Sequence, residues 1–122
     1  MTTLGVGIDL VDVARFEHVL RRRPKLIDRV FTVIEQTDAQ RRPERLAARF
    51  AAKEATFKAL GIGLGAAKLR DVEVRSSNVG APMLYLHGNA RRLAHERGVT
   101  IWHVSLTHTA TSAAAVVVGS SL

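Results

Sequence analysis

The segment from about Glu44 to Leu60 is predicted to form a long helix, and the rest of the chain must fold around it. Pro43 suits the first helical turn, which tolerates a residue without an N–H group, and Gly61 follows the last apolar position. At about 100° per residue, Phe50 and Phe57 fall about 20° apart on the helix surface. These two side chains therefore mark the stripe that faces a core.

Two charged residues lie beside this stripe. Glu54 falls about 40 to 60° from the aromatic positions, and Lys58 lies one turn further along. One interpretation is an ordinary surface pair, because Glu and Lys four residues apart attract each other on a helix. The other is a chemical role for a carboxylate that borders buried surface. The helix alone leaves both interpretations open.

The stretch LGVGID, residues 4 to 9, predicts a strand that ends in a second carboxylate. Its apolar residues alternate with Gly5, Gly7 and Asp9, so Asp9 lies on the glycine side. Small residues allow another element or a ligand to approach the backbone. Asp9 is therefore either a metal ligand or the cap of a helix that follows.

The remaining segments predict an α+β fold, with a small antiparallel sheet packed against helices. Residues 1–122 are too few for two lobes around a cleft, so we expect one domain. The other expected elements are a helix at about 12–22, a short helix ending at 31, a hairpin with strands near 72–74 and 84–86, a helix at about 89–97, and two strands within 100–109 and 113–119.

Composition limits the cellular setting and the kind of metal site. The chain has no cysteine, which excludes disulfides and thiolate ligands and suits the cytoplasm. We find no basic leader, and the longest apolar run, residues 113–118, is far shorter than the ~20 residues of a membrane span. We therefore expect a cytoplasmic protein, with no membrane partner, in which any metal is bound by carboxylate, imidazole or water.

The formal charge of +7 is concentrated between Arg15 and Arg45. Such a basic face attracts nucleic acid, an acidic protein or a phosphate-rich cofactor, although a charge run can also be simple solvated surface. Aromatic residues make up only 5% of the chain, which leaves few platforms for stacked bases. We therefore expect no nucleic-acid partner.

Three segments together resemble one enzyme family. They are GVGIDLVDVARF at residues 5–16, LAARFAAKEATFKALGIG at 46–63 and WHVSLTHTATSAAAVVV at 102–118. In order, spacing and total length they are similar to the signature blocks of the short bacterial 4′-phosphopantetheinyl transferases, the holo-acyl-carrier-protein synthases. The segments AAKLRD and GNARRLAHERG carry no such signature.

This resemblance implies transfer of 4′-phosphopantetheine from coenzyme A to a serine of an apo-acyl carrier protein in fatty acid biosynthesis, with release of adenosine 3′,5′-bisphosphate. The alternative acceptor is a carrier domain of a large fatty acid or polyketide synthase. The resemblance also implies Mg²⁺, with Asp9 and Glu54 as its ligands. Magnesium suits such a sparse pair because it keeps waters and takes phosphate oxygens as further ligands. Lys58 would stabilise the phosphate charge or the leaving bisphosphate. A non-catalytic scaffold of the same fold is disfavoured because these three residues are present.

Other site residues follow from the same resemblance. The proton acceptor for the serine is Glu54, His108 or a water on the metal, and we favour Glu54 or its water. The family implies a homotrimer with shared sites. The remaining assignments are coenzyme contacts at Thr107, His108, Arg49, Gly63 and Gly65, weaker ones at Gly80 and Pro82, and contacts to the acidic carrier at Arg15, Arg22 and Arg23.

Overall fold

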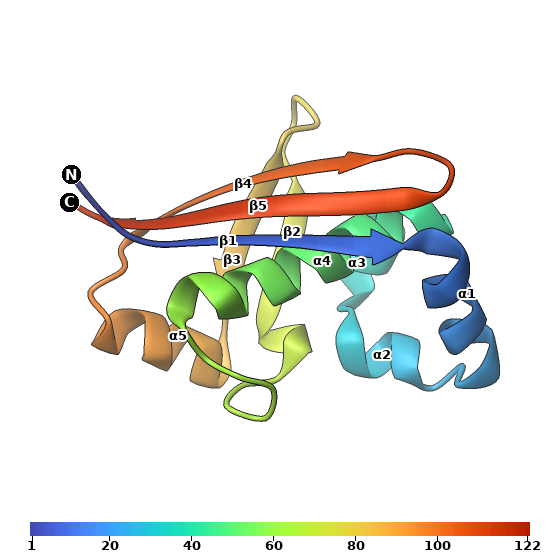
Figure 1. Cartoon of the computed structure of the whole chain (residues 1–122), viewed down its shortest axis with the longest axis horizontal. Coiled ribbons are helices and arrows are strands. Elements are labelled where there is room, and N and C mark those ends of the chain that lie inside the picture. The colour runs from blue at the N-terminus through green and yellow to red at the C-terminus, as the bar shows by residue number, and fades with distance from the viewer.

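The computed structural model describes residues 1–122 and has the expected α+β architecture (Figure 1). A three-stranded antiparallel sheet in the order β1-β5-β4 lies over one long helix, and a separate two-stranded hairpin stands beside them. The sheet strands are β1 (Thr2–Asp12), β4 (Ile101–His108) and β5 (Ser112–Ser121). The N and C termini lie side by side, because Thr2 pairs with Ser121.

The long helix α4 (Pro43–Leu60) is the centre of the core. Phe57 and Leu46 are buried, as the stripe predicts, together with five alanines along the helix. Gly61 ends the helix in the left-handed conformation, with φ of 67°, and its N–H bonds back to the carbonyl of Lys58. The predicted helix boundaries are thus confirmed to within one residue.

Five shorter helical segments surround α4. Helix α1 (Val13–Arg22) begins at Asp12, whose carboxylate accepts a hydrogen bond from the Arg15 backbone N–H at 2.9 Å. The others are α2 (Leu26–Val30), α3 (Val33–Asp38), α5 (Gly88–Glu96) and the single 3-10 turn η1 (Leu69–Asp71). The hairpin strands are β2 (Val72–Ser76) and β3 (Pro82–Leu86), as expected.

One helix was not predicted from the sequence. Helix α3 (Val33–Asp38) begins with a reciprocal cap, in which the Thr32 side chain accepts from the Glu35 N–H and the Glu35 side chain accepts from the Thr32 N–H. The sequence signal for it is a threonine followed three residues later by glutamate. Glu35 is fully buried, so this helix brings a charge into the core.

The sheet has one face on α4 and one face in solvent. Inward residues of β5, such as Ala113, Ala115 and Val117, are buried against the helix side. On the opposite face, which we call the outer sheet face, large apolar side chains of β1 and β5 are exposed: Leu4, Val6, Ile8, Leu10 and Val116. The apolar side of the first predicted strand therefore points away from the core of its own chain.

No helix combines the length and the hydropathy needed to cross a membrane.

Candidate active site

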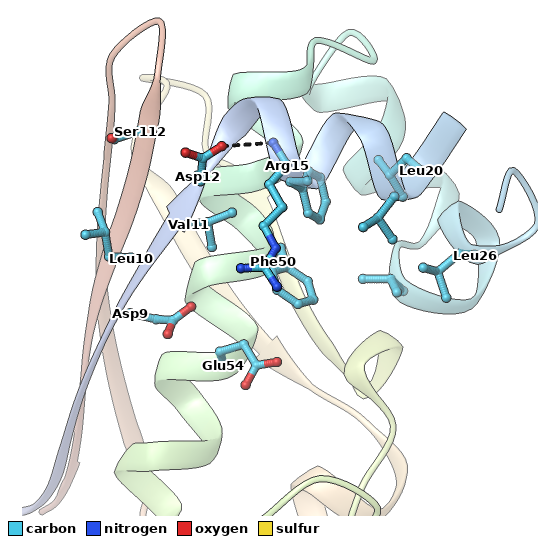
Figure 2. Close-up of a pocket in the computed structure, with 13 residues that line it drawn as sticks. Asp9, Leu10, Val11, Asp12, Arg15, Leu20, Leu26, Phe50, Glu54 and Ser112 are labelled. Carbon is cyan, nitrogen blue, oxygen red and sulfur yellow. Dashed lines mark hydrogen bonds between the residues drawn. The ribbon is translucent and has the colours of Figure 1, made fainter. Parts of the chain in front are cut away.

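A groove of about 660 Å³ opens between β1, α1, α2 and α4. Asp9 and Glu54 lie at one end of it, and Figure 2 shows their side chains on the same side of α4. The rest of the wall is mainly apolar and includes Phe16, Leu20 and Phe50. We call this space the carboxylate groove. It joins the two carboxylates that the sequence placed 45 residues apart on different elements.

Two glycines allow β1 to approach α4 closely enough to deliver Asp9. A Cβ atom on Gly7 would lie 1.8 Å from the Ala55 carbonyl oxygen, and one on Gly5 would lie 1.9 Å from that of Ala59. Both distances are well inside van der Waals contact, and the obstructing atoms are helix backbone. The glycine side of the strand therefore packs directly on the helix, and Asp9, two residues beyond Gly7, is carried to the groove.

Glu54 has an environment that resists ionisation. Partial burial raises its pKa, and the nearby Asp9 carboxylate raises it further, while the Lys58 ammonium acts in the opposite direction. Two like charges held close together favour a cation between or beside them. Such a perturbed carboxylate in a groove is a common sign of a functional site.

Lys58 pairs across space rather than along its own helix. Its Nζ donates to Asp9 Oδ1 at 3.1 Å and to the Ile8 carbonyl oxygen at 2.9 Å, and no ion pair joins it to Glu54. The simple surface pair between residues 54 and 58 is therefore the wrong interpretation. Because β1 passes directly over this part of α4, the lysine finds a closer partner on the strand.

Of the three predicted carrier contacts, Arg15 lines the carboxylate groove and lies nearest to the carboxylates. Its side chain extends from α1 toward Asp9 and Glu54 in Figure 2. Arg22 is the last residue of α1 and Arg23 is its C-cap, so both lie at the far end of this helix. The three side chains thus follow one helix away from the carboxylates.

Arg49 is placed outside the carboxylate groove. It is buried, its two terminal nitrogens make long hydrogen bonds of 3.4 Å to the Arg45 carbonyl and 3.2 Å to Ser76 Oγ, and its buried Nε has no partner. Burial lowers its pKa, which the Asp38 and Glu35 carboxylates oppose. Arg49 therefore lies near the turn end of the hairpin, and its Nε–H group has no hydrogen-bond acceptor.

The glycines assigned to the coenzyme are exposed in two separate loops. Gly63 and Gly65 lie between α4 and η1, and Gly65 has a φ of 95°. Gly80 has a φ of 81° in the hairpin turn, and Pro82 begins β3. None of these four lines the carboxylate groove.

Thr107 and His108 also lie apart from the two carboxylates within one chain. Leu106 pairs with Ala115, and Ala115 pairs with Asp9, so β5 separates the end of β4 from Asp9. Two strand spacings amount to about 10 Å. In addition, Thr107 is on the outer sheet face, because it is paired with Ala114 rather than with an inward residue.

Comparison with known proteins identifies the family. Residues 5–117 match the 4′-phosphopantetheinyl transferase superfamily. The chain belongs to this superfamily. A curated relative from Moorella thermoacetica, named holo-[acyl-carrier-protein] synthase, is 48% identical over 116 residues, which cover 93% of this chain and 91% of the relative. The family resemblance inferred from the three signature blocks is therefore confirmed.

Solved structures of holo-[acyl-carrier-protein] synthases have the same fold. The Helicobacter pylori protein in complex with coenzyme A is 31% identical, with a TM-score of 0.85 over 94% of this chain and 99% of that one. The Bacillus anthracis protein in complex with coenzyme A (3′,5′-ADP) is 33% identical, with a TM-score of 0.81 and full coverage of both chains. The predicted phosphopantetheinyl transferase fold is thus confirmed.

The donor set of this superfamily member suits a hard cation. No group of three or more His, Cys, Asp or Glu side chains is arranged to hold a metal ion. Magnesium, however, is commonly held by one or two carboxylates, with water and substrate phosphates as its other ligands. Asp9 and Glu54 provide such a pair, and their mutual repulsion fits a cation.

Sequence reasoning missed a second ion pair on α4. Lys53 Nζ donates to Glu35 Oε1 at 2.8 Å, and both side chains are fully buried. Burial lowers the pKa of Lys53, and the Glu35 carboxylate opposes that shift. The available signal was the Thr32–Glu35 cap, which marks α3 but not the packing of its glutamate against α4.

Proposed function

We propose that this chain is a holo-[acyl-carrier-protein] synthase. It moves 4′-phosphopantetheine from coenzyme A to a serine of apo-acyl carrier protein in fatty acid biosynthesis. Residues 1–122 act as one phosphopantetheinyl transferase domain. The observation that carries this proposal is the groove that joins Asp9 and Glu54, in a chain whose relatives have that name and are solved with coenzyme A.

The reaction exchanges one phosphorus–oxygen bond for another. The serine oxygen bonds to the phosphorus that carries the pantetheine, the bond to the second phosphorus group breaks on the other side, and adenosine 3′,5′-bisphosphate leaves. The serine proton passes to a base at the site, for which we favour Glu54, which lines the groove, or a water that it holds. Such transfers depend mainly on positioning and on compensation of negative charge.

Residues of the groove and of its surroundings divide this work. Asp9 and Glu54 would hold Mg²⁺, which when bound neutralises charge on the pyrophosphate. Lys58 is half exposed at the same site, so its ammonium can exchange Asp9 for a phosphate oxygen or the leaving bisphosphate. Arg49, with its unpartnered Nε, is assigned to the coenzyme together with the exposed glycines at positions 63, 65 and 80 and with Pro82.

The apolar groove beside the carboxylates receives the carrier protein. Arg15 at the groove and the arginines at positions 22 and 23 give this side a positive charge, which complements an acidic carrier. Replacement of Arg22 by Glu should weaken binding of apo-carrier more than binding of coenzyme A. Equal losses for both ligands would contradict this division of the surface.

A homotrimer with shared sites would complete the arrangement. The outer sheet face exposes large apolar side chains, including Val6, Ile8 and Leu10, which a second copy of the chain would cover. Thr107 lies on this outer sheet face, so a neighbouring subunit that covers the face would contact it. Multi-angle light scattering tests this assembly, and an active particle with the mass of one chain would contradict it. The cytoplasmic location stays a prediction from the sequence.

Intact-mass measurement of an apo-acyl carrier protein tests the function directly. Incubation with this protein, coenzyme A and Mg²⁺ should add the mass of one phosphopantetheine group to the carrier. A carrier domain excised from a large synthase serves as the second acceptor. No mass gain on either acceptor, from a folded protein supplied with Mg²⁺, would contradict the proposal.

A further inference from the structure

Lys53 precedes Glu54 on α4, but its side chain points away from the carboxylate groove and into the core. Its ammonium has three acceptors: Glu35 Oε1 at 2.8 Å, the Leu69 carbonyl oxygen at 3.1 Å and the Val72 carbonyl oxygen. An ammonium has three donors, so all of them are used. None of these contacts reaches the carboxylate groove.

Glu35 is equally committed. Its Oε1 accepts from the Thr32 N–H at 3.0 Å as well as from Lys53, and its Oε2 accepts from the Val74 N–H at 2.9 Å. The pair therefore links α4 and α3 to the first residues of β2 and to η1. Because η1 follows the loop that contains Gly63 and Gly65, the same ammonium also fixes the end of that loop.

This link controls how α4 is rotated about its axis. Successive residues on a helix are separated by about 100°, so a lysine fixed toward α3 and β2 directs the next side chain toward β1. Apolar burial is non-directional, and the buried face of α4 includes five alanines, which have small side chains. The three directional hydrogen bonds of Lys53 therefore set the rotation that brings Glu54 to Asp9.

Stability alone is a poor explanation for such a pair. Removing two charges from water is costly, and well-packed apolar side chains often stabilise a core as well or better. This fully buried Lys–Glu pair adjoins Glu54, a carboxylate of the groove. Its benefit therefore lies in the geometry of the groove rather than in stability.

We propose that the Lys53–Glu35 pair is a positioning device that fixes the rotation of α4 and thereby holds Glu54 beside Asp9 in the carboxylate groove, where the two would bind a divalent cation. This inference rests on the proposed metal site. Neither residue touches substrate or metal, so both act through Glu54.

The test uses the full-length protein with Lys53→Met and Glu35→Gln combined, which removes both charges and leaves neither one unpaired. Mn²⁺ replaces Mg²⁺, and its affinity is measured by electron paramagnetic resonance with coenzyme A present and no carrier. We expect Mn²⁺ affinity and kcat each to fall at least about tenfold, with KM for the carrier within about twofold, because misplacement by about 1 Å can cost 10²-fold.

Two further variants separate positioning from loss of stability. Val99→Ala weakens the cluster with Leu60 and Ala94, which does not line the carboxylate groove, and should lower Tm without changing Mn²⁺ affinity. Glu35→Asp alone keeps both charges and shortens the carboxylate side chain by one methylene group, and it should shift Mn²⁺ affinity in the same direction by a smaller factor. If the double variant does not fold by circular dichroism, this single variant decides.

A folded variant that binds Mn²⁺ and transfers as the wild type does would overturn the positioning role and leave the metal site intact. If the Asp9→Asn variant bound Mn²⁺ as tightly as the wild-type protein does, the metal site would be overturned, and the inference with it.

Discussion

Helix α4 carries two lysine–carboxylate pairs that are chemically alike and differ in access to water. In the Lys58–Asp9 pair the side chains are 55% and 19% exposed, whereas in the Lys53–Glu35 pair both values are 0%. The open pair has a second carboxylate, Glu54, beside it. The closed pair has its remaining hydrogen-bonding capacity filled by backbone groups.

This difference in exposure indicates different roles for the two pairs, a reactive role for Lys58–Asp9 and a structural role for Lys53–Glu35. Lys58 can leave Asp9 at small cost, because an exposed ion pair contributes only about 0–1 kcal/mol. Lys53 cannot leave Glu35 without stranding a charge in the core, which costs about 3–5 kcal/mol. Reactivity is therefore expected at the pair that solvent and ligands reach, and rigidity at the pair they do not reach.

The largest effect is expected at the open carboxylates. Asp9→Asn and Glu54→Gln each remove half of the charge that would hold the cation, so transfer should fall by at least about 10²–10³-fold. Intact-mass measurement of the carrier gives the rate, and circular dichroism confirms the fold. Transfer within a factor of a few of wild type in both variants would remove the groove from the mechanism.

The closed pair should respond in stability. Lys53→Met leaves the Glu35 carboxylate buried without its cation, and the free energy of unfolding should fall by about 3–5 kcal/mol. Urea unfolding measures this loss. The matched change Lys58→Met should cost less than about 1 kcal/mol, because that lysine is half exposed. Equal costs at the two positions would remove the distinction between the pairs.

Lys58→Met should instead lower the rate of transfer, by about 10- to 100-fold, because the phosphate charge loses one counter-charge. Lys58→Arg should keep part of the rate, since it retains the charge but not the compact ammonium. Single-turnover measurements at saturating carrier isolate this step. If the methionine variant transferred as fast as the arginine variant, the charge of Lys58 would have no role.

The smallest effect concerns pH. Because burial and the nearby Asp9 raise the pKa of Glu54, protons compete with the cation at a higher pH than they would at an ordinary glutamate. At limiting Mg²⁺, activity should fall as the pH drops through this raised pKa, and saturating Mg²⁺ should shift the fall to lower pH. A profile that does not move with Mg²⁺ concentration would contradict the competition.

The open carboxylates, Asp9 and Glu54, were accessible to sequence reasoning, and the closed Lys53–Glu35 pair was not. Asp9 stands out because Gly5 and Gly7 precede it at alternate positions, and Glu54 because it borders an aromatic stripe. Each lies in a short pattern whose geometry follows from helix or strand periodicity. Family resemblance then joined the two patterns, which periodicity alone could not do.

Glu35 and Lys53 meet only through tertiary packing. The Thr32–Glu35 cap indicates a helix start, but nothing local shows that this helix packs on the same side of α4 as Lys53. The outer sheet face was missed for a similar reason. Leu4, Val6 and Ile8 have the pattern of a core-facing strand, and the pattern does not tell whether the core belongs to the same chain or to another.

The most direct test of the central claim is the affinity for Mn²⁺, measured with coenzyme A present, in wild-type protein, Asp9→Asn and Glu54→Gln. If the open carboxylate pair holds the cation, wild-type protein binds Mn²⁺ saturably and each variant loses most of that affinity while remaining folded. Undiminished Mn²⁺ affinity in both variants would contradict the account.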